Sequence, residues 1–155
     1  MALEVPVSLP NLASEKVHPS MCWCLKYAQS VAVMVSWALC KVVHGFGRTN
    51  ELRDALNTFS PFVALREDRI VAYASAVTFW PLNHGVAETE EDMKALLVGA
   101  GAMSQEPLSF LLPVRQAGFF RWCLNGGLRV VKPMTLMVKG KYQEPNGCYF
   151  TSVLY

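Results

Sequence analysis

The pattern of apolar residues predicts helices within residues 21–59 and strands within residues 62–80. Residues 21–43 are apolar on nearly every side, which predicts a helix held between two other surfaces and ending near Gly45. In residues 51–59 the apolar positions share one side, which predicts a second helix capped by Thr49 or Asn50. Residues 21–59 are therefore expected to be mainly helical.

The middle of the chain carries two strand-like runs. Residues 62–67 and 69–80 are rich in β-branched and aromatic side chains around the charged pair Glu67-Asp68, a pattern that predicts a β-hairpin. Weak alternation in the second run is typical of a central strand covered on both faces. Residues 81–85 interrupt the pattern, so the second strand is expected to end in a loop.

The remaining residues predict two helices and three strands. Thr89, followed by Asp92, resembles a capping box and is expected to begin a helix that continues to residue 103. Apolar runs and glycine stops then predict a strand, a helix and a closing hairpin of two strands, over residues 108–114, 118–127, 128–140 and 147–155.

Composition limits the class of protein. The 155 residues are 52% hydrophobic and 17% charged, which excludes an intrinsically disordered chain. A net charge of +2 without a basic run argues against nucleic acid as a partner. Residues 1–20 hold three prolines and are interpreted as a lead-in segment with at most one short strand. One domain is expected over residues 21–155.

The cysteines and the apolar run at 21–43 bear on location. Five cysteines without a regular framework are typical of packed thiols in a reducing compartment, and no spacing predicts a metal site. The N-terminus lacks the pattern of a signal peptide. Polar residues interrupt the run 21–43, which argues against a membrane span. A cytoplasmic location is therefore expected.

Four segments resemble a known family. They are HGFGRTNELRDAL, RIVAYASAVTFW, HGVAETEEDMKALL and FLLPVRQAGFFRWCLNGGLRVVKPMTLM, within residues 37–155. They resemble the GNAT acyl-CoA N-acyltransferase superfamily, and most of all the second half of bacterial two-lobed GNAT proteins. The resemblance implies an α+β fold with a mixed, mostly antiparallel, twisted sheet flanked by helices. It also implies an acetyl-CoA-dependent N-acetyltransferase whose amine acceptor is unknown.

The resemblance places the cofactor loop at residues 81–92, where family members hold the pyrophosphate with backbone N–H groups of a glycine-rich loop. It implies that Thr78, Asn83 and Gly85 contact acetyl-CoA. This loop departs from the family pattern, because Gly85 is its single glycine and four carboxylates follow it. Each carboxylate would repel the pyrophosphate by about 1 kcal/mol. The alternative is therefore a non-catalytic GNAT-like module used for dimerisation or ligand sensing.

The resemblance also suggests residues for the chemistry. His84 or Glu88 would act as the base for an amine nucleophile. Cys123 stands where the family often has a tyrosine that acts as the general acid and protonates the departing thiolate. The alternatives are a turn histidine and a packed thiol. His44, Arg48 and Glu51 would line an acceptor pocket, or else form a helix cap with a surface ion pair.

The apolar surplus predicts a partner. Half of a two-lobed protein packs one flank against the other half, and a separate copy would expose that flank. We therefore expect a homodimer, or pairing with a second GNAT-like lobe. The surfaces expected to pair are the helix 21–43 and the closing hairpin with Phe150, Val153 and Tyr155.

Overall fold

A computed structural model describes residues 2–4, 21–25, 29–45, 47 and 49–153. The strands of the larger sheet are, in spatial order, β2 (Met21–Leu25), β3 (Phe62–Arg66), β4 (Arg69–Ala74), β5 (Gly85–Ala87) and β8 (Cys148–Phe150). Those of the smaller sheet are β6 (Ser109–Leu111), β1 (Ala2–Glu4) and β7 (Arg129–Lys132).

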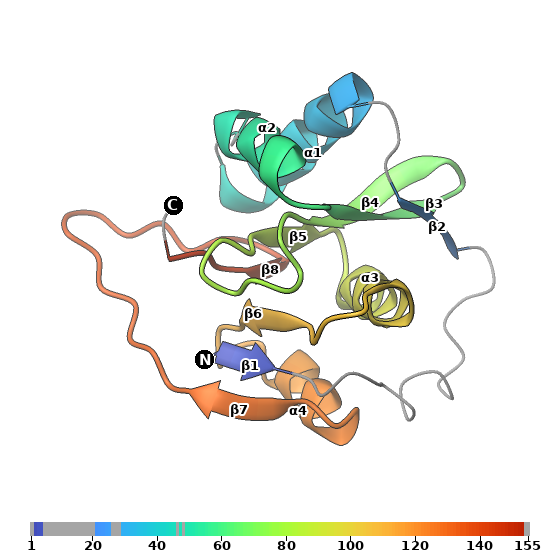
Figure 1. Cartoon of the computed structure of the whole chain (residues 1–155). Helices are drawn as coiled ribbons and strands as arrows, with labels where there is room; N and C mark the ends of the chain where they lie inside the picture. The colour runs from blue at the N-terminus through green and yellow to red at the C-terminus, as the bar shows by residue number, and fades with distance from the viewer. Residues whose placement is uncertain (1, 5–20, 26–28, 46, 48, 154–155) are drawn as a thin grey trace.

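Two helical layers cover the larger sheet (Figure 1). Helices α1 (Gln29–His44) and α2 (Thr49–Thr58) lie on one face, and α1 contacts β4 and β5. Helix α3 (Glu90–Met103) lies on the other face, followed by the smaller sheet and α4 (Ala117–Asn125). The α+β class is confirmed. Every strand pair among the described residues is antiparallel, in two sheets rather than one mixed sheet.

The larger sheet separates two apolar cores. The core on the α3 side contains Met93, Phe110, Phe119 and Phe150, and that on the α1 side contains Leu39, Val43, Tyr73, Val86 and Tyr149. Successive residues of a strand point to opposite faces, so β4, β5 and β8 contribute to both cores. The expectation that β4 is a central strand covered on both faces is confirmed.

Local signals placed two features correctly. The hairpin β3–β4 turns at Glu67 and Asp68, both with positive φ, as the two-residue turn of a tight hairpin requires. Thr89 caps α3, because its side-chain oxygen accepts a hydrogen bond from the Asp92 N–H.

The prediction of a helix over residues 21–43 is wrong at the N-terminal end of that range. Residues Met21–Leu25 form β2 and pair in full with β3, and the helix begins only at Gln29. The outer edge of β3 offers unpaired backbone groups, and pairing satisfies them. The strand expected over 69–80 is likewise shorter and ends at Ala74. Part of the expected loop 81–92 is instead β5, which inserts between β4 and β8.

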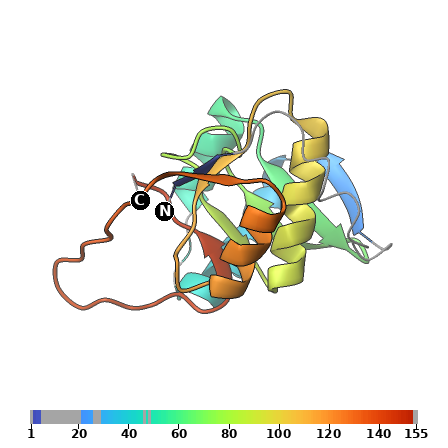
Figure 2. The same ribbon diagram turned by 90° about the horizontal axis from the view of Figure 1, so that it is seen from below.

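The prediction of a closing hairpin is also wrong. β7 pairs with β1 in the smaller sheet, whereas β8 pairs with β5 in the larger one. Residues 133–147 between them have no regular structure. The first part of this segment extends from the body of the protein (Figures 1 and 2), whereas residues 144–146 return to it and contact Arg115 and Val43. Most of the lead-in segment lies outside the described residues, and Ala2–Glu4 forms the one short strand described there.

No helix within the described ranges is both long enough and apolar enough to cross a membrane.

The fold requires a glycine at position 85. A Cβ atom there would lie 2.6 Å from Cδ2 of Phe150 and 3.1 Å from the carbonyl oxygen of Tyr73. We expect Gly85→Ala to lower the free energy of unfolding by about 1–3 kcal/mol, since it overpacks the sheet. Urea denaturation measures the change.

Gly118→Ala is the matched control. Its Cβ would meet only Glu90, at 3.4 Å, and the position is exposed within α4. Because alanine favours helix by up to about 1 kcal/mol over glycine, this variant should be neutral or more stable. Equal losses in both variants would contradict the packing role of Gly85.

Candidate functional site

The residues expected to contact a cofactor have structural partners. Asn83 is fully buried; its Nδ2 donates to the carbonyl of Ser109 at 3.0 Å, and its Oδ1 accepts from the Ala76 N–H at 3.3 Å. The first bond ties the segment between β4 and β5 to β6, and the second closes a loop within that segment. Gly85 is packed beneath Phe150, and Thr78 lies half-buried in the turn after β4. The segment is thus bound into the fold on both sides of Gly85.

Two arginines pair with the carboxylates at the start of α3. Arg66 donates to Asp92 and to Glu88, both at 3.1 Å, and Arg69 also pairs with Glu88. Asp92 is fully buried and accepts a further bond from the Thr89 hydroxyl, at 2.6 Å. Buried carboxylates need such partners, because an unpaired charge away from water is costly. The sequence predicted a cluster of carboxylates that would repel a pyrophosphate. In the structure, two of them, Glu88 and Asp92, are paired with arginines.

The pairing continues along α3. Lys94 contacts Glu90 at 3.0 Å and Glu91 at 2.7 Å, one turn back on the same helix. Negative charge at this end of a helix is also favoured by its dipole. The four acidic side chains of residues 88–92 are thus each paired with a cation of this chain.

A second polar group lies on the opposite face of the sheet, beneath α1. The hydroxyl of Tyr73 lies 2.9 Å from Nδ1 of His84, and Nε2 of His84 lies 3.1 Å from Nε2 of His44. Cys40 lies one turn before His44, and its Sγ and the two ring nitrogens all lie within 4.8 Å of one another. All four side chains are buried. His44 and His84 are therefore brought together, while the described partners of Glu88 are arginines.

Cys123 lies elsewhere, in the core on the α3 side. Burial, and then the neighbouring Cys148, raise the pKa of its thiol far above the usual range. Burial also raises the pKa of Cys148 to about 12. A thiol in this apolar setting acts as a packed side chain, and His84 belongs to the other face of the sheet. The three expected catalytic residues do not converge on one point.

Two expected acceptor residues remain without a described side chain. Arg48 lies outside the described residues. Glu51 lies in α2, and its side chain is not described. Of that group only His44 is placed, within the buried cluster.

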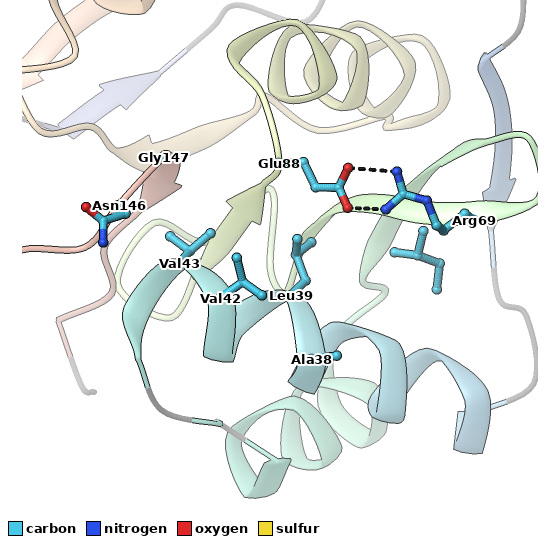
Figure 3. A pocket seen from close by; sticks show the side chains of 9 residues that line it. Ala38, Leu39, Val42, Val43, Arg69, Glu88, Asn146 and Gly147 are labelled. Carbon is cyan, nitrogen blue, oxygen red and sulfur yellow. Dashed lines mark hydrogen bonds and ion pairs between the residues drawn. The ribbon is translucent and has the colours of Figure 1, made fainter.

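A pocket of about 550 Å³ opens beside α1. Its lining residues are Ala38, Leu39, Val42, Val43, Arg69, Ile70, Glu88, Asn146 and Gly147. Figure 3 shows the Arg69–Glu88 pair at one end and Asn146 with Gly147 at the other, with the apolar face of α1 between them. Sequence reasoning missed this pocket, because its residues come from four separate segments. Its one local signal is the group of apolar residues Ala38, Leu39, Val42 and Val43 at helical spacing on α1.

Comparison of the chain with protein-family models, with curated proteins and with solved structures found no match.

The environment of Cys123 predicts its reactivity. Because its pKa is raised, the reactive thiolate is scarce near neutral pH, and iodoacetamide should modify Cys123 and Cys148 only after unfolding. Mass spectrometry of tryptic peptides, from native and urea-unfolded protein, measures the rates. For Cys148 the thiolate should form as the pH approaches 12. Fast modification of Cys123 in the native protein at pH 7 would contradict its role as a packed side chain and would favour its role as the general acid.

Proposed function

We propose that this chain is a non-catalytic, GNAT-like module that senses a small ligand in the pocket beside α1. The observation that carries the proposal is the paired network at the start of α3. Arg66 and Arg69 bind Glu88 and Asp92 at the helix end where the family resemblance expects a pyrophosphate. An incoming pyrophosphate would meet these carboxylates, one of them fully buried, and both arginines are already paired with them.

The pocket suggests the class of ligand. Its α1 wall is apolar, and the Arg69–Glu88 pair supplies charge at one end. A volume of about 550 Å³ lies within the range of small-molecule sites. These features favour a small molecule with an apolar body and one polar end.

Acetyl-CoA-dependent N-acetyltransfer is the second candidate. The observed order from β3 to β8, a hairpin, a strand, a helix, a strand, a helix and two further strands, favours it, because the resemblance rested on a similar order. The proposed base is less favourable. His84 is buried between Tyr73 and His44, and Glu88 is paired with two arginines.

A titration distinguishes the two candidates. We expect no heat from acetyl-CoA or CoA in calorimetry, even at millimolar ligand, and saturable binding of the fluorescent probe anilinonaphthalene sulfonate. Ala38→Phe fills the pocket from an exposed position and should weaken probe binding about tenfold. Ala102→Phe, at an exposed position of α3, is the control and should change nothing.

The outcomes separate cleanly. Micromolar acetyl-CoA binding would replace this proposal with the acetyltransferase. Equal probe binding by both phenylalanine variants would contradict the pocket.

The proposed partner is a second copy of the chain, or a second GNAT-like lobe. Phe150, which was expected on the pairing surface, is instead fully buried. Six exposed apolar side chains lie in residues 130–138, which are the end of β7 and the segment after it and are called the arm here; they include Val131, Leu136 and Met137. Met137 is 87% exposed. The arm continues from β7, an edge strand whose outer backbone groups can pair with another chain.

The arm predicts a concentration-dependent dimer. Adding charge with Leu136→Lys and Met137→Lys should raise the dimer dissociation constant about tenfold or more, because apolar contacts are lost. Thr135→Lys adds charge at an exposed polar position of the same arm and should have a smaller effect. Sedimentation equilibrium measures the constants. A wild-type chain that stays monomeric across the micromolar range would contradict this partner.

A further inference from the structure

The buried cluster beneath α1 has the composition of a metal site. Cys40 and His44 are four residues apart on α1, so that their side chains share one face of the helix. His84 approaches from the segment just before β5, 40 residues away from His44 in the chain. Thiolate and imidazole are the ligands that zinc prefers in proteins. We propose that Cys40, His44 and His84 bind one Zn²⁺ ion.

The distances suit a single ion. Zinc lies about 2.0–2.1 Å from histidine nitrogen and about 2.3 Å from cysteine sulfur, which sets neighbouring tetrahedral ligand atoms about 3.3–3.6 Å apart. The two Nε2 atoms are 3.1 Å apart, and Sγ of Cys40 lies within 4.8 Å of the ligand nitrogens. Binding would require side-chain rotations that bring the three ligand atoms to one centre. Three protein ligands leave the fourth position for water or an external ligand.

Tyr73 orients one of the ligands. Its hydroxyl lies 2.9 Å from Nδ1 of His84, which directs Nε2 of the same ring toward His44. Histidine ligands of metals usually have such a partner on the second nitrogen. Tyr73 is 1% exposed and belongs to the core of the α1 side, so its position is held by packing.

The protons balance on uptake of the ion. In one proton arrangement of the metal-free protein, Tyr73 donates to Nδ1 of His84, and Nε2–H of His84 donates to His44. On binding, the His84 proton moves to Nδ1 and is donated to the Tyr73 oxygen, which frees Nε2 for the metal. Cys40 loses its thiol proton to solvent. One Zn²⁺ is taken up and one proton released.

The ion would connect two parts of the fold. Cys40 and His44 belong to α1, and His84 belongs to the β4–β5 segment. His44 also packs edge-on against Tyr149 of β8, with ring centroids 5.4 Å apart. Zinc would therefore hold α1 against the larger sheet. This role is separate from ligand binding in the neighbouring pocket, whose lining residues do not include the three ligands.

Cobalt titration of the whole, metal-stripped chain tests the site. One equivalent of Co²⁺ should give tetrahedral d–d bands and a near-ultraviolet thiolate-to-cobalt band, and Zn²⁺ should abolish both. Cys40→Ser should remove the thiolate band, and His84→Gln should weaken Co²⁺ binding at least tenfold. Cys123→Ser, a buried cysteine of the other core, is the matched control and should keep the full spectrum.

Other results would overturn the proposal. They are no tetrahedral spectrum, or a thiolate band that survives Cys40→Ser and disappears on substitution of Cys22 or Cys24. X-ray absorption of the zinc-loaded wild-type chain gives an answer even if a variant fails to fold, which circular dichroism would reveal. One sulfur and two imidazole ligands are expected. Two sulfurs, or none, would exclude this ligand set.

Discussion

The ion pair between Arg66 and the buried Asp92 is the interaction on which the arrangement of this protein depends. Asp92 is fully buried, and a carboxylate in that position is tolerated only with a charged or hydrogen-bonding partner. Arg66 ends β3, whereas Asp92 lies in the first turn of α3, so the pair sets the helix against the sheet. The same guanidinium binds Glu88, which with Arg69 forms the charged end of the pocket. The Arg66–Asp92 pair is therefore joined, through Glu88, to the Arg69–Glu88 pair that lines the proposed binding site.

The two faces of the larger sheet differ in the reactive side chains that they bury. On the α3 side, aromatic rings stack closely, with Phe110 and Phe150 centroids 4.3 Å apart, and the thiols of Cys123 and Cys148 pack among them. On the α1 side lie Tyr73, the two histidines and the pocket. Buried polar groups require partners, and here the partners come from different elements. Ligand and metal binding are both proposed on the α1 side, because the pocket and the buried histidines both lie there.

The two cores do not bury all the apolar side chains of the chain. The strands β7 and β8 belong to different sheets, so the segment between them has no described strand neighbour in this chain. Its apolar side chains are exposed along an arm that continues an edge strand. Part of the surplus therefore appears at a place where a second chain can add backbone and side-chain contacts, and part remains exposed at Val42 of α1 and at Val153, on the surfaces expected to pair.

Sequence alone was sufficient where the deciding contacts are local. The β3–β4 turn at Glu67-Asp68 and the Thr89 cap of α3 follow from residues within a few positions of one another, whereas the α+β class was implied by the resemblance of longer segments. Tertiary structure decided the rest. β2 became a strand because β3 has an open edge, and β5 because β4 and β8 pair with it. Likewise Glu88 meets Arg66 and Arg69, and His84 meets His44 at a separation of 40 residues. These contacts join segments far apart in the chain, and no local propensity or spacing encodes which of them will meet.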